Sequence, residues 1–470
     1  MSVPRPAPAD GGRGLVRALT TRDALLLTVG SVVGTGIFLT GSDMARALPH
    51  AGLLLAAWLA AGLLTLAGAA AYAELGVLFP RAGGLYNYLA QAWGPLAGFL
   101  YGWAGFLVLM SGGIAAISVG FGATLGGFVP LFSTERVLAS ASFGSLTWKL
   151  TGAQAAGAAA ILILTGVNLR GLSSGARTQR TLTLLTCGAL VAFVAAGLLV
   201  RPGAGAPLLG PLPAISGWGA FGVATLAALW TFDGWYGLTL SAGELKDPAR
   251  SLPRGLIGGV AVVLVLYVGL QLVYARALSI PEMTAAPRIG EAAAEALFGA
   301  AAGRAVGLVV LVSSLGCLAA SILYASRLYA PMAEDGLFFH ALARIDPASR
   351  VPASSLKAQG LWSALLALSG SYDQLYTYAV FGGVLFHAAT AAGLFVLRRR
   401  HADLPRPYRA WGYPLVPALF VAASTGIAAL TLLERPFESL AGLGLIAAGL
   451  PAYAFWRRKR RWGVAGEPGA

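Results

Sequence analysis

The chain has 470 residues, of which 57% are hydrophobic and only 11% are charged. Soluble proteins carry about 25% charged residues, so this composition excludes an ordinary soluble domain and indicates a protein with many membrane spans. The formal net charge of +14 comes largely from basic residues between apolar runs and near the C-terminus. Such clusters are typical of membrane topology signals, an interpretation that we favour over nucleic-acid binding.

A helix needs about 20 apolar residues to cross a bilayer. Residues 1–22 have no apolar core, so we expect a short cytoplasmic tail rather than a signal sequence. About twelve apolar runs follow, and the third is long enough to predict a strong tilt or an extension into an exterior loop. The predicted spans are residues 24–46, 51–78, 95–129, 152–168, 179–200, 218–241, 254–276, 302–330, 355–370, 374–397, 414–433 and 438–456.

Lys and Arg are distributed unevenly between the two sides of this predicted array. If the N-terminal tail is cytoplasmic, most of the 33 Lys and Arg residues lie on the cytoplasmic side, with dense runs at residues 398–400 and 457–461. This is the positive-inside pattern. We therefore predict a multi-pass protein of the cytoplasmic membrane with both termini in the cytoplasm, and the alanine, glycine and arginine usage suggests a bacterial cell.

The first predicted span contains a helix-breaking stretch, GSVVGTGIF, at residues 30–38. Each glycine in a helix interior costs about 1 kcal/mol relative to alanine. A break at membrane depth is tolerated where it is buried in protein or lines a water-filled cavity. A second half-helix beginning near Thr35 would present bare N–H groups and a positive dipole end, which suit a carboxylate. The alternative is close helix packing through the Gly30 and Gly34 spacing.

The sixth predicted span repeats this signal. It reads ALWTFDGWYGLTLSAGEL, with Asp233 and Gly234 inside an apolar, aromatic-rich run that lies five spans after the first break. Broken helices at corresponding positions of two halves indicate a midplane binding site in an inverted-repeat transporter. We expect an all-α membrane fold of about twelve spans, with a five-plus-five inverted repeat, broken first and sixth helices and two accessory helices. The predicted segments are a tail at 1–22, repeats at 23–200 and 201–400, accessory spans at 401–457 and a basic tail at 458–470.

Five segments in the same order as in a known family cover nearly the whole chain. They are GSVVGTGIF at 30–38, YAELGVLFPRAGGLYNYL at 72–89, WTFDGWYGLTLSAGELKDPARSLPRG at 230–255, SRLYAPMAEDGLF at 326–338 and DLPRPYRAWGYPLVP at 403–417. Together these segments resemble the amino acid–polyamine–organocation superfamily and, within it, the L-type amino acid transporters. The resemblance implies a secondary transporter that moves L-amino acids, neutral and in some cases cationic, by alternating access.

The resemblance also implies how a substrate would be held. The carboxylate would rest on the first break, and the α-amino group would bind free carbonyls just before that break and at the sixth-span break. A half-helix N-terminus and unwound carbonyls suit the two ends of a zwitterion. The implied substrate-binding residues are Val32, Val33, Gly34, Thr35, Gly36, Ile37, Trp230, Thr231, Phe232, Asp233 and Gly234.

Two residues of the sixth span have alternative interpretations. Trp230 matches an aromatic gate over the substrate in the family, and its alternative is a place in the interfacial tryptophan belt. Asp233 is an ionisable group inside a span, which is a functional hypothesis by default. Its carboxylate would attract a cationic side chain, a proton, or only the N–H groups of its own break.

Further positions are implied by alignment with the family. The side-chain pocket would be lined by small residues of the third and eighth spans, which alternatively only pack helices. These are Ser111, Gly112, Gly113, Ala319, Ala320 and Ser321. The family commonly has a lysine in the fifth span, where this chain has Thr183 and Thr186 as candidate coupling residues. Their hydroxyls would either help to coordinate sodium or bond the preceding helical turn.

Other features narrow the function. Cys187 and Cys317 fall in predicted spans without metal-ligand spacing, and the loop at 130–151 has no cysteine for a disulfide-linked partner subunit. We expect Glu74 to anchor a gate or loop, and His387 to have a hydrogen-bonded packing role. No catalytic set, metal site, cofactor or ATP-binding motif is expected, so a sodium or proton gradient, or exchange, would supply the energy. A polyamine transporter and a non-transporting amino-acid sensor remain the alternatives.

Overall fold

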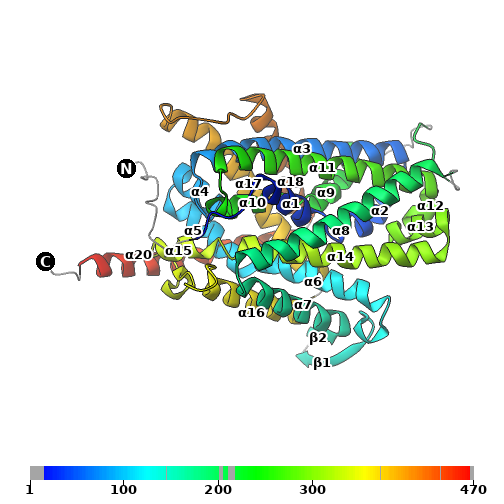
Figure 1. The fold of residues 1–470 in the computed structure, drawn as a ribbon, viewed down its shortest axis with the longest axis horizontal. Helices are drawn as coiled ribbons and strands as arrows, with labels where there is room; N and C mark the ends of the chain where they lie inside the picture. Colours follow the sequence, from blue (N-terminus) through cyan, green and yellow to red (C-terminus); the bar gives the residue numbers. More distant parts are fainter. Residues whose placement is uncertain are drawn as a thin grey trace.

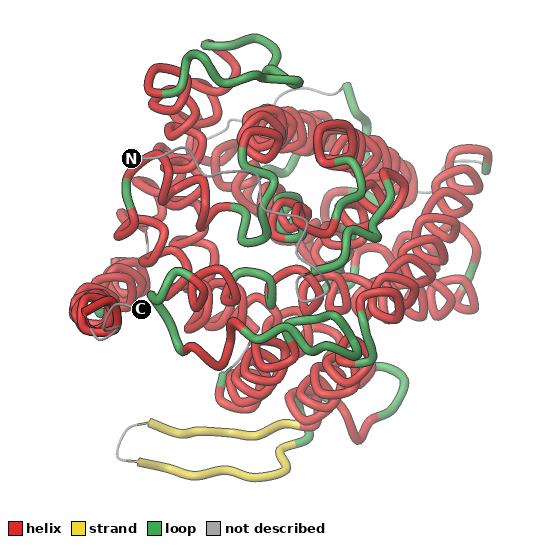
Figure 2. The backbone as a smooth tube through the Cα atoms, turned by 60° about the vertical axis from the view of Figure 1, so that its left-hand side comes forward, coloured by secondary structure: helices red, strands yellow, loops and turns green. Residues whose placement is uncertain are grey.

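The computed structural model describes residues 15–143, 146–200, 205–209, 217–370, 372–434 and 436–465. Within these ranges the chain is a helical bundle with one small β hairpin (Figures 1 and 2). The predicted all-α membrane fold is confirmed, and the hairpin is an addition to it.

The bundle is built from helices of very unequal length. Short helices and 3-10 turns (η2 to η4) connect the long ones, and a π-helical segment (η1) interrupts the third predicted span. The elements are α1 (Thr21–Val32), α2 (Gly36–Ala47), α3 (Ala51–Leu78), α4 (Leu85–Trp93), α5 (Pro95–Ala104), η1 (Gly105–Leu109), α6 (Met110–Gly126), η2 (Pro130–Phe132), β1 (Val137–Phe143), β2 (Leu146–Thr151), α7 (Gly152–Leu169), α8 (Leu172–Leu199), α9 (Gly217–Thr231), α10 (Gly237–Leu240), η3 (Ala242–Glu244), α11 (Pro248–Ala277), α12 (Ile280–Ala285), α13 (Ile289–Phe298), α14 (Ala300–Ala325), α15 (Tyr329–Glu334), η4 (His340–Ala343), α16 (Ala353–Ser369), α17 (Tyr372–Arg400), α18 (Leu415–Glu434), α19 (Pro436–Ala447) and α20 (Gly449–Ala465).

Nine helical segments in the described ranges are long and apolar enough to cross a membrane, and the bent pair of α1 and α2 makes a tenth. The predicted count of twelve is not reached by this criterion. The two missing segments are α9, with 15 residues, and α16, with 17 residues. Both are shorter than the roughly 20 residues of a full crossing, and α9 ends at Thr231, where the second predicted break begins.

The outward faces of the long helices are apolar. Ile163 of α7 is 66% exposed and Val265 of α11 is 71% exposed, and many further leucines and valines are exposed in the same way. Exposed apolar area on this scale is unfavourable in water and matches a hydrocarbon environment. The protein is therefore a multi-pass membrane protein.

The first helix lies in the middle of the bundle. Its start is fixed by a capping box, in which the Thr20 hydroxyl accepts from Asp23 N and the Asp23 carboxylate accepts from Thr20 N. From there α1 packs against α8, α11 and α14, and α3 runs beside α11 (Figure 1). This packing buries the first break inside the protein, where irregular backbone at membrane depth is tolerated.

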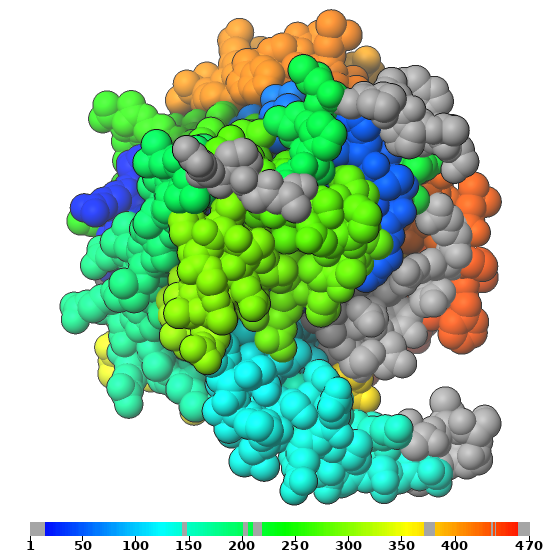
Figure 3. Space-filling view, turned by 90° about the vertical axis from the view of Figure 1, so that its right-hand side faces the viewer, coloured from blue at the N-terminus to red at the C-terminus, as the bar shows by residue number. Residues whose placement is uncertain are grey.

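The two ends of the bundle differ in structure. The hairpin, α12 and α13 lie at one end, and α15 and α20 lie at the other (Figure 1). Figure 3 shows the first of these ends, with β1 and its neighbours projecting from the lower edge. The strands pair antiparallel, with Ala141 opposite Trp148, and the Trp148 indole N–H donates to Leu368 O at 3.1 Å. This bond ties the hairpin to the end of α16.

Candidate functional site

The first span is broken where the glycines predict it. Helix α1 ends at Val32, α2 begins at Gly36, and the two helices are bent by 44°. The expected start near Thr35 is confirmed to within one residue, because Thr35 is the N-cap of α2. No side-chain hydrogen bond to this cap is found within the described residues. The N-terminus of α2 therefore keeps N–H groups and a positive dipole end for other partners.

The sixth span is broken as well. Helix α9 ends at Thr231, and α10 begins only at Gly237. Gly234 between them has φ +92°, which a residue with a side chain rarely adopts, and a Cβ there would lie 2.5 Å from Ser31 O. The Ser31 hydroxyl donates to Gly234 O at 3.0 Å. The two breaks thus contact each other directly.

A cavity of about 620 Å³, including its opening, lies between the two breaks, α6 and α14. Its wall combines backbone of the breaks with aromatic and small side chains. Ten of the predicted residues line it: Val32, Gly34, Thr35, Gly36, Gly113, Trp230, Thr231, Asp233, Gly234 and Ser321. Lining residues that the sequence interpretation missed include Ser31, Met110, Ile114, Tyr236, Cys317 and Tyr324. Their small, apolar or aromatic side chains carry no distinctive signal, and only their spacing from predicted residues could have indicated them.

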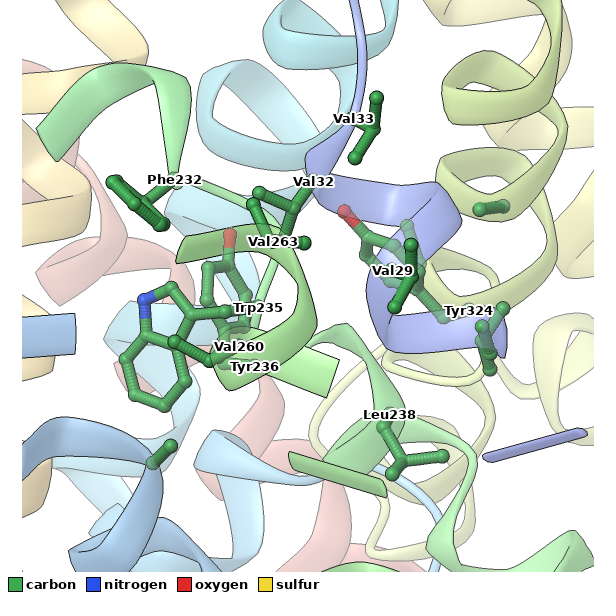
Figure 4. Close-up of a cluster of buried hydrophobic side chains, with 14 of the residues drawn as sticks. Val29, Val32, Val33, Phe232, Trp235, Tyr236, Leu238, Val260, Val263 and Tyr324 are labelled. Carbon is green, nitrogen blue, oxygen red and sulfur yellow. The ribbon is translucent and has the colours of Figure 1, made fainter. Parts of the chain in front are cut away.

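Seven other predicted residues lie outside this lining. They are Val33, Ile37, Ser111, Gly112, Phe232, Ala319 and Ala320. Phe232 shows the reason most clearly: its ring packs against Tyr267 at 5.0 Å and Trp58 at 6.3 Å between centroids. Figure 4 shows the Phe232 side chain well to the left of Val32 and Val33. Successive residues of a tight turn or helix point in different directions, so only part of each motif can face one cavity.

The sequence predicts free backbone carbonyls at the breaks, but three of these carbonyls already accept hydrogen bonds from side chains. The Tyr267 hydroxyl lies 3.1 Å from both Val32 O and Thr231 O. The Ser313 hydroxyl donates to Val33 O at 2.9 Å. The single Tyr267 hydroxyl proton is shared between Val32 O and Thr231 O, while the Ser313 hydroxyl bonds Val33 O, and these contacts hold the breaks in shape. Each carbonyl oxygen keeps a lone pair for a further donor.

Asp233 borders a second, more apolar cavity of about 870 Å³, including its opening. This cavity lies between α3, α6, α17, α18 and the second break, and it shares Trp230, Asp233 and Tyr236 with the first cavity. The Asp233 side chain is 43% exposed although it lies in the interior of the bundle. Its carboxylate is therefore accessible to a molecule in either cavity.

The candidate coupling residues lie at a third, small space beside the first break. Thr183 and Thr186 line it together with Gly30, Val33 and Ser313. Gln179, one turn before Thr183, donates from Nε2 to Leu26 O at 2.7 Å and to the Thr183 hydroxyl at 2.8 Å. The Thr186 hydroxyl is buried without a hydrogen-bond partner in the described part of the chain. Gln179 thus braces α8 against α1, a role that the sequence interpretation missed.

Two buried carboxylates fasten the segments around the site. The Glu244 carboxylate forms a two-pronged pair with the Arg327 guanidinium, with both distances at 3.0 Å and both side chains no more than 1% exposed. Glu74 pairs in the same way with Arg398, at 2.9 and 2.6 Å, and accepts from Ala410 N at 2.7 Å. The second set ties α3 to α17 and to the following loop, which is the loop anchor expected for Glu74.

The broken spans and the shared cavity define a class of protein, namely a secondary transporter of the membrane. Comparison with known proteins then gives the family. The chain matches the amino acid permease family over residues 19–437 and belongs to it. The protein is an amino acid permease, and the resemblance stated from the sequence is confirmed.

Individual relatives are similar over nearly their whole length. The serine/threonine exchanger SteT of Bacillus subtilis (strain 168) is 29% identical over 454 residues, covering 95% of this chain and 98% of the relative. The large neutral amino acids transporter small subunit 2 of Homo sapiens is 28% identical, covering 97% of this chain and 84% of the relative. The human cystine/glutamate transporter is 26% identical, covering 95% and 87%. These relatives favour amino acid transport over the polyamine and sensor alternatives.

Proposed function

We propose that this permease binds the backbone of an L-amino acid between the two helix breaks. The substrate carboxylate would accept hydrogen bonds from the N-terminal turn of α2, at Thr35 and Gly36. The α-amino group would donate to carbonyls at the ends of α1 and α9, using the lone pairs that Tyr267 and Ser313 leave available. A helix N-terminus favours the anion and the unwound carbonyls favour the cation.

We propose that the substrates are neutral and cationic amino acids. The observation that carries this proposal is the Asp233 carboxylate, which is 43% exposed and is shared by both cavities. Asp233 is the one formally charged side chain among the described residues that line them. A carboxylate in the interior of a membrane protein gains from an opposite charge, so a cationic side chain would bind beside Asp233, while leucine-like side chains would fill the apolar wall.

We propose exchange as the mode of transport, with a sodium ion or a proton as the alternative driving ion. Support for exchange comes from the serine/threonine exchanger among the relatives. For an ion, the unpartnered hydroxyl of Thr186 beside the first break is the candidate oxygen ligand. The proposed architecture is a pair of inverted repeats at 23–200 and 201–400, and no disulfide-linked subunit is required because the loop at 130–151 has no cysteine.

Uptake into proteoliposomes tests these proposals. The purified protein would be reconstituted and offered labelled leucine, serine, arginine, glutamate and putrescine, with and without unlabelled leucine inside, under sodium or proton gradients. We expect leucine and arginine uptake that needs internal amino acid. Uptake that follows an ion gradient without internal amino acid would replace exchange by coupling. Uptake of putrescine alone would overturn the substrate proposal, and binding without flux would favour a sensor.

A further inference from the structure

A buried histidine faces the carboxylate at the substrate cavity. His387 of α17 is 8% exposed and lines the second cavity. Its Nε2 lies 3.9 Å from Asp233 Oδ1, and its Nδ1 lies 2.9 Å from the Tyr72 hydroxyl. The hydrogen bond to Tyr72 agrees with the packing role expected from the sequence. The approach to Asp233 is a second feature that the packing role does not require.

Aromatic rings surround this histidine. The ring centroids of Tyr236, Trp235 and Tyr72 lie 4.5, 5.8 and 6.0 Å from that of the imidazole. Aromatic faces attract a cation within about 6 Å, and the carboxylate adds a full opposite charge. The rings and the Asp233 carboxylate are therefore groups that would attract an imidazolium at this position.

The other groups around His387 limit which charges can affect it. Tyr236 and Asp233 face it from the second break, and Tyr72 faces it from α3. The same cavity is lined by Tyr101 of α5 and by Ser424 of α18. Asp233 is the one carboxylate among these described neighbours, so the charge state of His387 is linked first to Asp233.

The hydrogen bonds define the two states of the imidazole. When Tyr72 donates to Nδ1, the ring proton is on Nε2 and points toward Asp233. When Nδ1 takes a proton from hydronium in the cavity, a water molecule is released and both ring nitrogens become donors. The hydrogen bond to Tyr72 then reverses, and Nδ1–H donates to the Tyr72 oxygen. The cation then lies beside Asp233 and reduces the attraction of its carboxylate for another cation.

We propose that His387 is a specificity-determining residue whose protonation switches the site from cationic toward neutral substrates. This inference rests on the proposed function, in which Asp233 faces the substrate side chain. At high pH the neutral imidazole leaves the Asp233 charge available to arginine or lysine. At low pH the imidazolium pairs with the Asp233 carboxylate and repels a second cation. Leucine carries no side-chain charge, so its uptake changes little.

The test measures arginine and leucine uptake at equal pH on both sides of the proteoliposome, from pH 5 to 8. Equal pH removes the proton gradient, so any change in the arginine-to-leucine ratio reports selectivity and not a driving force. We expect the ratio to fall about tenfold between pH 8 and pH 5, because the imidazolium lies about one ion-pair distance from the carboxylate. In His387→Gln the ratio should stay constant.

Two further variants sharpen the test. Tyr72→Phe removes the hydrogen-bond partner of Nδ1. Because hydrogen bonds of a charged donor are stronger, this change removes more stabilisation from the imidazolium than from the neutral imidazole. The midpoint of the selectivity change should therefore move to lower pH, which a purely structural role of Tyr72 would not produce. His340→Gln, at an exposed histidine outside the spans, is the matched control and should keep the wild-type pH profile.

The possible outcomes separate this inference from the proposed function. A ratio that falls with the same midpoint in His387→Gln would assign the change to Asp233 alone and overturn the role of His387. A constant ratio in the wild type would overturn it as well, while leaving amino acid transport intact. Absence of arginine and leucine uptake at every pH would instead refute the proposed substrates. His387→Asn serves as a second variant if His387→Gln is not recovered as a folded protein.

Discussion

Gly36 shows at the scale of one residue why the first break needs glycine. A Cβ at this position would lie 2.9 Å from Thr231 Cγ2, so any side chain forces the two breaks apart. The proposed carboxylate site lies at the same helix turn. Glycine is thus required both for close approach of the breaks and for open access to the N–H groups of α2.

We predict that Gly36→Leu weakens substrate binding at least tenfold, because the leucine side chain separates the breaks and covers the donors of α2. Binding of labelled leucine to detergent-purified protein measures this. The matched control is Gly188→Leu on α8, where a new Cβ meets no atom within 4 Å. Wild-type affinity in Gly36→Leu would refute the proposed carboxylate site.

Asp233→Asn should lower arginine uptake about tenfold and leave leucine uptake within about twofold, because the amide keeps the shape of the carboxylate but not its charge. The ratio of the two initial rates in proteoliposomes is the measurement. Asp43→Asn serves as the control, since Asp43 is exposed and pairs with Arg46 on the surface. An equal loss for both substrates would assign Asp233 a structural or coupling role.

At the scale of elements, the pair of Glu244 and Arg327 joins η3 to the segment between α14 and α15. Both side chains are no more than 1% exposed. Leu19 N donates to Glu244 O at 2.9 Å, so the segment before α1 is attached to the same residue. Removing one partner of a buried pair leaves an uncompensated charge, which costs more than the pair itself contributes.

Arg327→Met should therefore destabilise the protein by about 3–5 kcal/mol, because it leaves the Glu244 carboxylate buried and unpaired. The thermal unfolding midpoint in detergent is the measurement. The double variant Glu244→Leu with Arg327→Met should recover most of the loss, since it leaves no unpaired charge. Arg46→Met, which removes a surface pair, should change the midpoint little. A double variant as unstable as Arg327→Met would show that lost packing, and not an unpaired charge, causes the loss of stability.

At the scale of the whole molecule, the distribution of basic residues predicts the orientation in the membrane. A cysteine at Ala402, in the exposed loop after α17, should react with an impermeant thiol reagent only from the cytoplasm. A cysteine at Ser140, on the exposed hairpin, should react only from outside. The background would carry Cys187→Ala and Cys317→Ala. Ile163→Cys, on a lipid-facing surface, should react from neither side. The reverse pattern would overturn the predicted orientation.

Much of this molecule follows from local properties of the chain. The length of apolar runs predicted the spans, because a bilayer requires a fixed number of helical residues. Glycine clustering predicted the first break, since glycine is a poor helix former. Asp233 beside Gly234 inside an apolar run predicted the second break. The helices α9 and α16 lie within two of the predicted spans, but each is shorter than a full crossing. The length of an apolar run did not predict where these two helices end, because helix ends and breaks also depend on tertiary packing.

What the sequence by itself determined is therefore the membrane class, ten of the twelve predicted spans in the described part of the chain, and the positions of the breaks at Gly34 and Gly234. Only the tertiary structure decided which side chains face the cavity and that the Tyr267 and Ser313 hydroxyls donate to carbonyls of the breaks. It also decided that His387 lies beside Asp233. The physical reason is distance along the chain. Helix propensity and hydropathy act over one or two turns, whereas these contacts join residues more than 100 positions apart, or different helices, and depend on how the bundle packs.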